Sequence, residues 1–91
     1  MRKITNTSRF KKDLKKADKQ NKDIGALTDV VNLLANDRNL DARMKDHDLS
    51  GNWSGFRECH IEPDWLLIYK KIEDPSELHL IRLGSHSELF K

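Results

Sequence analysis

Residues 56–71 read FRECHIEPDWLLIYKK, and this stretch sets the architecture that we expect. Residues 56–61 alternate in character as a β-strand with two different faces would. Pro63 fixes its own φ and restricts the residue before it, which predicts a turn at 62–64. The apolar run that opens the segment 65–71 has strand length and is typical of a buried central strand. The stretch therefore predicts two neighbouring strands, which a short link pairs antiparallel.

Two segments with helical periodicity precede these strands. The first has a cap candidate at Thr7 or Ser8, is rich in lysine, and is expected to end near Asn21. The second begins after a cap candidate at Asp23 and ends in the polar stretch 36–39. The tight link between them predicts a helical hairpin.

Further strands are expected on both sides of the 56–71 stretch. A short strand starts at Ile4, another lies around 43–47, and a third covers 78–83, where Ile81 and Leu83 should share a face by alternation. Residues 85–90 predict one short helical turn. We therefore expect a single α+β domain over residues 1–91, with two N-terminal helices packed on a small twisted antiparallel β-sheet and the opposite sheet face partly open.

Charge is distributed unevenly along the chain. The net charge is only +2, but residues 2–22 contain 9 Lys or Arg and 2 Asp, a local charge of +7. Such a segment suits a polyanion or an acidic partner, although a solvated helix face with no partner has the same pattern. There is no apolar run long enough for a membrane span and no secretory signal. The lone Cys59 excludes an internal disulfide and fits a reducing compartment, so we expect a cytoplasmic protein.

Three histidines fall at strand ends or turns, where side chains from separate strands can converge on a ligand. They are His47, His60 and His86, and Asp64 follows the predicted turn after His60. If the strands pair as neighbours, Arg82 comes close to them. Such a set can cleave a phosphodiester: a carboxylate or imidazole deprotonates the attacking 2′-hydroxyl, Arg stabilises the phosphorane, and a second imidazole protonates the leaving oxygen. The alternative is that these histidines are ordinary surface residues.

Metal binding is a competing interpretation of the same residues. His47, His60, Asp64 and His86 all carry ligand atoms. None has the tight ligand spacing of a helical metal motif, and a lone cysteine argues against a structural zinc site. We therefore expect no metal or other cofactor.

Two aromatic residues, Trp65 and Phe90, have two possible roles each. Trp65 opens a predicted buried strand, and Phe90 lies near the C-terminus, so each can simply be packed. An exposed aromatic ring can instead stack on an RNA base. Cys59 is expected to be a small buried side chain rather than a nucleophile, and His79 a structural residue within its strand.

The quoted motifs resemble one known group. The runs DHDLSGNWSGFR at 46–57, HIEPDWLLIY at 60–69 and RLGSHSELF at 82–90 resemble the YafQ branch of the RelE/ParE toxin superfamily, and the basic helical N-terminal half fits as well. The resemblance covers the whole chain. Matched motif by motif, it implies an active site made of His47, His60, Asp64, Arg82, His86 and Phe90, adjoined by Trp65. Asp64 and His60 are candidates for the base, His86 for the acid and Arg82 for the phosphate stabiliser.

The resemblance also implies an activity and partners. The activity is metal-independent cleavage of messenger RNA in the ribosomal A site by attack of the ribose 2′-hydroxyl. The partner is a cognate antitoxin that neutralises the toxin and, through their complex, brings it to operator DNA. The basic segment then has a role, in which exposed lysines steer the toxin to ribosomal RNA; these are Lys11, Lys12, Lys15, Lys16 and Lys19. The alternatives are a non-catalytic ParE-like inhibitory binder and a regulatory DNA-binding module.

Overall fold

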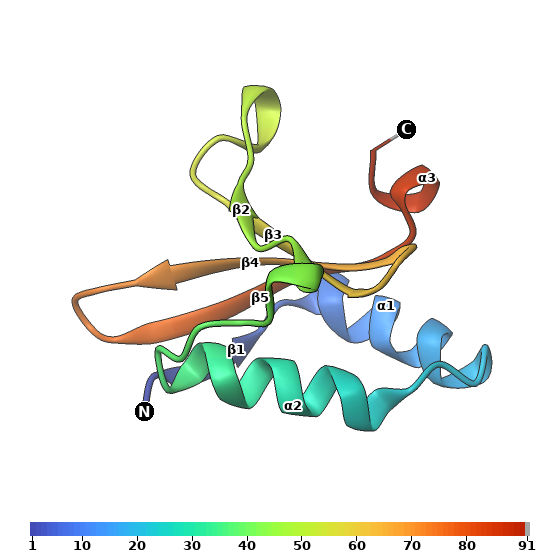
Figure 1. Cartoon of the computed structure of the whole chain (residues 1–91), viewed down its shortest axis with the longest axis horizontal. Helices are drawn as coiled ribbons and strands as arrows, with labels where there is room; N and C mark the ends of the chain where they lie inside the picture. Colours follow the sequence, from blue (N-terminus) through green and yellow to red (C-terminus); the bar gives the residue numbers. More distant parts are fainter. Residues whose placement is uncertain (91) are drawn as a thin grey trace.

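The computed structural model describes residues 1–90 and shows a five-stranded sheet with two helices on one side (Figure 1). The sheet order is β1-β5-β4-β3-β2. The elements are β1 (Lys3–Asn6), α1 (Ser8–Lys19), α2 (Ile24–Ala35), β2 (His47–Asp48), β3 (Arg57–Glu62), β4 (Trp65–Ile72), β5 (Glu77–Gly84) and α3 (His86–Leu89), with 3₁₀ turns η1 (Ala42–Met44) and η2 (Gly51–Trp53).

The predicted α+β architecture is confirmed, with one change in the sheet. Strands β2 to β5 pair antiparallel with their neighbours, as the short links between them require. β1 joins the sheet beside β5 and runs parallel to it. The sheet is therefore mixed, because the chain passes through both helices and three strands before it returns beside β1.

The two long helices form the layer below the sheet in Figure 1. The predicted caps are present: Thr7 Oγ1 accepts a hydrogen bond from Phe10 N at 3.1 Å, and Asp23 Oδ1 accepts one from Ala26 N at 3.0 Å. Phe10 and Leu34 then meet the sheet in the main core, where each is at most 2% exposed. Within residues 1–90, no helix has the length and apolar character to span a membrane.

A β-bulge in β5 changes which residues share a face. Ile68 pairs with Arg82 and Tyr69 with Leu80, so Ile81 is the extra residue. Leu83 consequently lies in the main core, between the sheet and the two long helices, whereas Ile81 packs on the opposite face of the sheet. The simple alternation predicted for 78–83 was wrong for this reason.

The face away from the helices carries a second, smaller core. Leu66, Ile68 and Leu89 are buried there, with Trp53 and Phe56 packed against them. The 49–56 loop and α3 both lie above the sheet in Figure 1. The predicted helical turn at 85–90 is confirmed as α3, whose N-terminus is fixed by a capping box between Ser85 and Glu88. This face is therefore covered only in part, as the sequence predicted.

The strand predicted around 43–47 is largely absent. Residues 42–44 form the 3₁₀ turn η1, and only His47 and Asp48 pair with β3. Asp41 Oδ1 accepts a hydrogen bond from Arg43 N at 3.0 Å, and Lys45 adopts a left-handed φ of 48°. Both features favour a turn over an extended strand, and they leave the end of β3 beyond Glu58 without a strand neighbour on this side.

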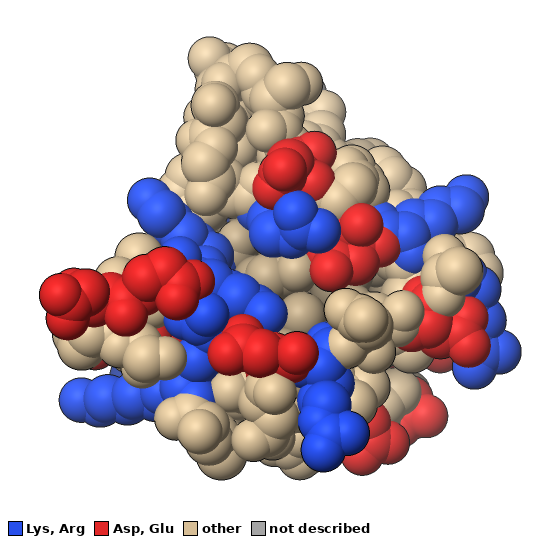
Figure 2. Space-filling view, turned by 60° about the vertical axis from the view of Figure 1, so that its left-hand side comes forward, with Lys and Arg blue, Asp and Glu red and all other residues tan. Residues whose placement is uncertain are grey.

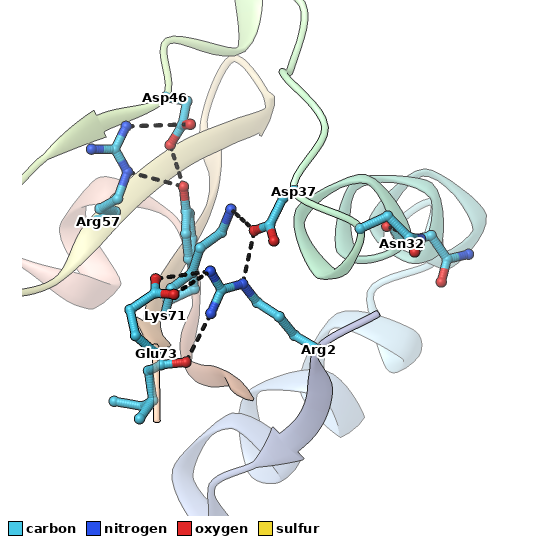
Figure 3. A network of polar contacts seen from close by, with 10 residues as sticks. Arg2, Asn32, Asp37, Asp46, Arg57, Lys71 and Glu73 are labelled. Carbon is cyan, nitrogen blue, oxygen red and sulfur yellow. Dashed lines mark hydrogen bonds and ion pairs between the residues drawn. The ribbon is translucent and has the colours of Figure 1, made fainter. Parts of the chain in front are cut away.

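An ionic cluster ties three distant parts of the chain together (Figure 3). Arg2 Nε donates to Asp37 at 2.8 Å, and Arg2 Nη2 donates to Glu73 at 2.8 Å. Lys71 Nζ lies 2.9 Å from the same Asp37 oxygen. Hydrogen bonds from these two cations lower the pKa of Asp37. The cluster joins the N-terminus, the end of α2 and the β4–β5 turn.

Candidate active site

The centre of the site is a contact between Asp64 and His86. Asp64 Oδ1 accepts a hydrogen bond from the His86 backbone N–H at 3.1 Å and lies 3.0 Å from His86 Nδ1. The His60 ring lies edge-on to the His86 ring, with 5.5 Å between their centroids. The β3–β4 turn supplies Asp64, and the capping box of α3 fixes His86. The structure thus brings these three predicted residues together.

The hydrogen-bond geometry assigns the protons of His86. An ionised carboxylate is an acceptor only, so Nδ1 of His86 carries the hydrogen and Nε2 faces away from Asp64. Hydrogen bonds from the His86 backbone and ring hold the pKa of Asp64 below its ordinary value. Asp64 is therefore ionised at neutral pH, and the exposed Nε2 of His86 is available to exchange a proton with a substrate.

His47 lies in a second pair, with Glu58. Its Nε2 is 3.0 Å from Glu58 Oε2, and its Nδ1 is 3.0 Å from the Asp48 carbonyl oxygen. The carbonyl can only accept, so Nδ1 carries a hydrogen. The Nε2–Oε2 contact therefore brings the imidazole against a carboxyl group that is itself buried.

Glu58 is a site residue that the sequence reasoning missed. It is 4% exposed, and its Oε1 atom is buried without a hydrogen-bond partner among the described residues. Buried carboxyl oxygens almost always have a partner, so an unpaired one indicates a function or a ligand. Its position on β3, two residues before His60 on the same face, was the signal in the sequence, because i and i+2 residues of a strand point the same way.

Pairing across the sheet explains why these residues meet. Directly paired residues of neighbouring strands share a face. His47 pairs with Glu58, Glu58 with Ile68, and Ile68 with Arg82. One row of the sheet thus places His47 and Glu58 on the face away from α1 and α2, and it ends at Arg82, whose side chain turns back to Asp13 of α1. His60 lies on the same face in the next row, paired with Leu66.

Arg57 braces the loop that carries His47. Its guanidinium contacts Asp46 at 3.3 Å and Asp48 at 2.7 Å, the residues on either side of His47. Asp46 also accepts a hydrogen bond from Tyr69 Oη at 2.5 Å (Figure 3 shows Asp46 beside Arg57). Burial, and next the bond to Asp46, raise the pKa of Tyr69 above its ordinary value. Since both flanking carboxylates point toward Arg57, His47 points the other way, toward Glu58.

Arg82 is not in contact with the histidines. Its Nε donates to Asp13 Oδ2 at 2.7 Å, and its Nη2 lies 3.4 Å from Asp13 Oδ1. The same Oδ2 accepts from Leu83 N at 3.0 Å. This pair joins α1 to β5 just beyond the end of β1. Nη1 takes no part in the contact, so the predicted contact of Arg82 with a phosphate stays a prediction.

The two aromatic predictions have different outcomes. Phe90 is 37% exposed and lies 6.3 Å from the His86 ring and 6.0 Å from the Trp53 ring, measured between centroids. It is therefore placed beside the site with part of its ring accessible. Trp65 is 2% exposed in the main core, so its ring is not free to stack on a base. Trp65 therefore packs in the core, and its burial does not fit the predicted contact with RNA.

The predicted basic segment belongs to α1, and one of its lysines reaches α3. Lys11, Lys12, Lys15, Lys16 and Lys19 are all exposed. Lys16 forms an ion pair with Glu88 of α3, so it joins the basic helix to the helix that bears His86. Side chains of both charges are mixed on the face shown in Figure 2, and its uncharged top is the 49–56 loop.

Two further predictions concern residues outside the site. Cys59 is fully buried in the main core, as expected for a packed side chain, and burial raises the pKa of its thiol to about 12. A thiol with such a pKa is no nucleophile at neutral pH. His79 pairs with Glu77 on its own strand at 2.8 Å, in agreement with a structural role.

Comparison with known proteins identifies the family of this chain. Residues 2–91 match the family described as the bacterial toxin of type II toxin-antitoxin systems, YafQ. The chain belongs to this toxin family. The resemblance inferred from the sequence motifs is therefore confirmed. The chain is a toxin of a type II toxin-antitoxin system.

Three relatives bear on the function. The mRNA interferase toxin YafQ of Escherichia coli K12 is 42% identical over 90 residues, which cover 98% of this chain and 96% of that protein. The structure of the E. coli DinJ–YafQ complex superposes with a TM-score of 0.90 at 41% identity and full coverage of both chains. A metal-bound toxin from Helicobacter pylori superposes with a TM-score of 0.94 at 46% identity, over 99% of this chain and all of that one.

Proposed function

We propose that this chain is a ribosome-dependent mRNA endoribonuclease, and that it cleaves by attack of a ribose 2′-hydroxyl on the adjacent phosphate. The observation that carries the proposal is the contact of His86 with Asp64 beside the ring of His60. Two adjacent imidazoles, one of them oriented by a carboxylate, can move two protons in one reaction. Its relatives include a YafQ named as an mRNA interferase.

His60 is the better placed base and His86 the acid. Both hydrogen bonds of Asp64 Oδ1 come from His86, so Asp64 orients this imidazole and leaves Nε2 to act on the leaving oxygen. The 2′-oxygen attacks phosphorus as its proton passes to His60. The bond from phosphorus to the 5′-oxygen breaks as His86 protonates that oxygen. The products are a 2′,3′-cyclic phosphate and a 5′-hydroxyl.

Three other groups support this reaction. The pair of His47 and Glu58 lies on the same sheet face as His60 and adds an imidazole and a carboxyl group beside the reacting residues. Arg82 has Nη1 outside its pair with Asp13 and can stabilise the charge of the phosphorane. Phe90 offers a partly exposed ring on which a base of the RNA can stack.

The ribosome and an antitoxin are the proposed partners. The exposed lysines of α1 lie next to α3, so they are placed to bind ribosomal RNA phosphates while the site reaches the messenger RNA. This activity belongs in the cytoplasm. The E. coli YafQ forms a complex with DinJ, and we propose a cognate antitoxin for this chain that also links it to operator DNA.

The test compares the wild type with His86→Ala and with the matched control His79→Ala, which removes an imidazole outside the site. Each protein is added to translating ribosomes and the messenger RNA ends are mapped. We expect new ends inside the A-site codon with the wild type and with His79→Ala, and none with His86→Ala. Equal inhibition of translation by all three proteins without new ends would favour the ParE-like binder.

A second candidate property is metal binding, which one observation favours. His47, Glu58 and His60 each offer a ligand atom within 4.8 Å of the others, and Glu58 Oε1 is unpaired among the described residues. Two imidazoles and a carboxylate suit Zn²⁺ or Cu²⁺. A related H. pylori toxin is metal-bound. These residues therefore fit a metal, although not the four ligands considered from the sequence; Glu58 stands in place of Asp64 and His86.

Metal binding at these three residues should depend on pH. Metal ions bind the deprotonated forms of imidazole and carboxyl ligands, so binding should release protons and weaken as pH falls. Calorimetry with Zn²⁺ in two buffers of different ionisation enthalpy measures this release. Loss of Zn²⁺ binding in Glu58→Gln but not in Asp64→Asn supports the three-residue site. Cleavage that a chelator abolishes and Zn²⁺ restores would make the metal part of the reaction.

A further inference from the structure

A hollow beside His60 is not used by the reaction described above. It has a volume of about 440 Å³ and is lined by η1 with the residue after it, and by the end of β3 with Pro63. Ligand pockets commonly measure about 300–1,000 Å³. It exists because β2 pairs only with Arg57 and Glu58, so the next residues of β3 have η1 as their neighbour instead of a strand.

The wall of the hollow carries two cations on η1 and its following residue, an apolar surface, and one exposed carboxylate, that of Glu62. Arg43 is 83% exposed and only loosely paired, with its Nε 3.8 Å from Asp41. Lys45 is exposed and has no ion pair within residues 1–90. Met44 and Ile61 both pack on the main core, which fixes the apolar wall between these cations.

The turn that carries the cations is held at both ends. Asp41 caps its start by accepting from Arg43 N at 3.0 Å. Its end is closed by Lys45 N, which donates to the Ala42 carbonyl at 3.1 Å, with Lys45 in the left-handed region. The backbone from which Arg43 and Lys45 project is therefore ordered without any ligand, which lowers the entropic cost when a ligand binds.

The hollow is continuous with the catalytic cluster. His60 lines it, and the His60 ring lies 5.5 Å from that of His86. A nucleotide next to the scissile phosphate must lie within one nucleotide length of these two rings.

We propose that this hollow is a nucleotide subsite, which binds the messenger RNA nucleotide adjacent to the scissile phosphate. Arg43 and Lys45 contact its phosphate, and the base rests on the wall formed by Met44, Ile61 and Pro63. This inference rests on the proposed ribonuclease function and names how its substrate is held. The subsite would also give a role to the turn at 42–44, because this turn, in place of the expected strand, opens the hollow.

The first test is binding of a mononucleotide, which needs no cleavage. The ¹⁵N-labelled protein is titrated with adenosine 5′-monophosphate and, separately, with inorganic phosphate. We expect the largest amide shifts at residues 43–45 and 60–62, and larger shifts with the nucleotide than with phosphate because the base also binds. Shifts confined to other residues, or no shifts, overturn the subsite whether or not the protein cleaves RNA.

The second test uses cleavage on programmed ribosomes at several salt concentrations. The double variant Arg43→Gln/Lys45→Gln is compared with Lys3→Gln/Arg38→Gln, which removes the same charges elsewhere. We expect the first to lower the slope of log kcat/KM against log salt by about 1 for each phosphate that it no longer neutralises, and the control to leave it unchanged. Equal slopes for the two variants overturn the subsite. A wild type that cleaves nothing overturns the proposed function instead.

Discussion

His86 Nδ1 lies 3.0 Å from Asp64 Oδ1, across 22 residues of chain. The carboxylate fixes which nitrogen of the imidazole carries the hydrogen, and it leaves Nε2 open to the substrate. Both side chains are more than half exposed, so the contact adds little to stability. In the proposed reaction, its role is to place a proton.

The first prediction concerns Asp64→Asn. The amide keeps the size of the side chain but removes the carboxylate that orients His86, and it can reverse the ring hydrogen bond. We expect kcat to fall about 10²–10⁴-fold, the range for a misplaced general acid or base. The melting temperature should stay close to that of the wild type. A large loss of stability with little loss of kcat would contradict the role given to Asp64.

The second prediction concerns the buried Trp65. Trp65→Ala should lower the free energy of unfolding by about 3–5 kcal/mol, as truncation of a large core side chain does. Trp65→Phe should recover most of this stability and cleave RNA at a rate near that of the wild type. Denaturant unfolding and RNA-end mapping measure the two quantities. A stable Trp65→Phe protein that fails to bind RNA would restore the stacking role.

The third prediction is a pH dependence at Glu88. The ion pair with Lys16 and the hydrogen bond from Ser85 N lower the pKa of Glu88 to about 2. A lowered folded-state pKa gives stability that is present above the ordinary glutamate pKa and is lost as pH falls toward 2. The wild type should therefore be more stable than Glu88→Gln at pH 7, with a difference that shrinks between about pH 4.5 and 2. A constant difference over this range would contradict the ion pair.

The fourth prediction concerns the pair of Asp13 and Arg82, whose side chains are only 13% and 16% exposed. Asp13→Ala leaves Arg82 without its carboxylate and Leu83 N without its acceptor, and should cost about 3 kcal/mol of unfolding free energy. Arg82→Lys keeps a charge but cannot make the two-nitrogen contact. If Arg82 also stabilises the phosphorane, Arg82→Lys should lower kcat more than Asp13→Ala does. The opposite order in kcat would limit Arg82 to a structural role.

The fifth prediction separates the lysines of α1. All five are predicted to meet ribosomal RNA, but Lys16 is paired with Glu88, whereas the other four have no ion pair within residues 1–90. Reversing Lys11, Lys12, Lys15 and Lys19 to Glu should weaken ribosome binding strongly at low salt and much less at high salt. Lys16→Gln alone should change stability more than binding. Unchanged binding of the fourfold variant at low salt would remove the electrostatic role of this helix.

Sequence patterns predicted the fold where local chemistry decides it. Pro63 set the turn between β3 and β4, the run from Trp65 formed the buried central strand, and Asp23 capped α2. These patterns failed where contacts between residues far apart in the sequence determine the structure. The bulge at Ile81 moves Leu83 to the helix side of the sheet, and nothing in the alternation of β5 shows it.

The candidate site was also predicted only in part. His60, Asp64 and His86 have titratable side chains and lie at turns or strand ends, so they were predicted to converge, and the structure brings them together. Glu58 was missed because a glutamate in a strand is ordinarily a solvent-facing residue. Only the pairing of β2 with β3 brings His47 onto it and buries it.

The most direct measurement of the central claim uses a messenger RNA with a single 2′-deoxyribose at the scissile nucleotide. It is placed in the A site of purified ribosomes, with a chelator present, and cleavage is compared with that of the all-ribose message. Attack by the 2′-hydroxyl, with His60 and His86 moving the protons, predicts a 2′,3′-cyclic phosphate from the ribose message and no cleavage of the deoxy message. Cleavage of the deoxy message at an equal rate, with 5′-phosphate ends, would contradict it.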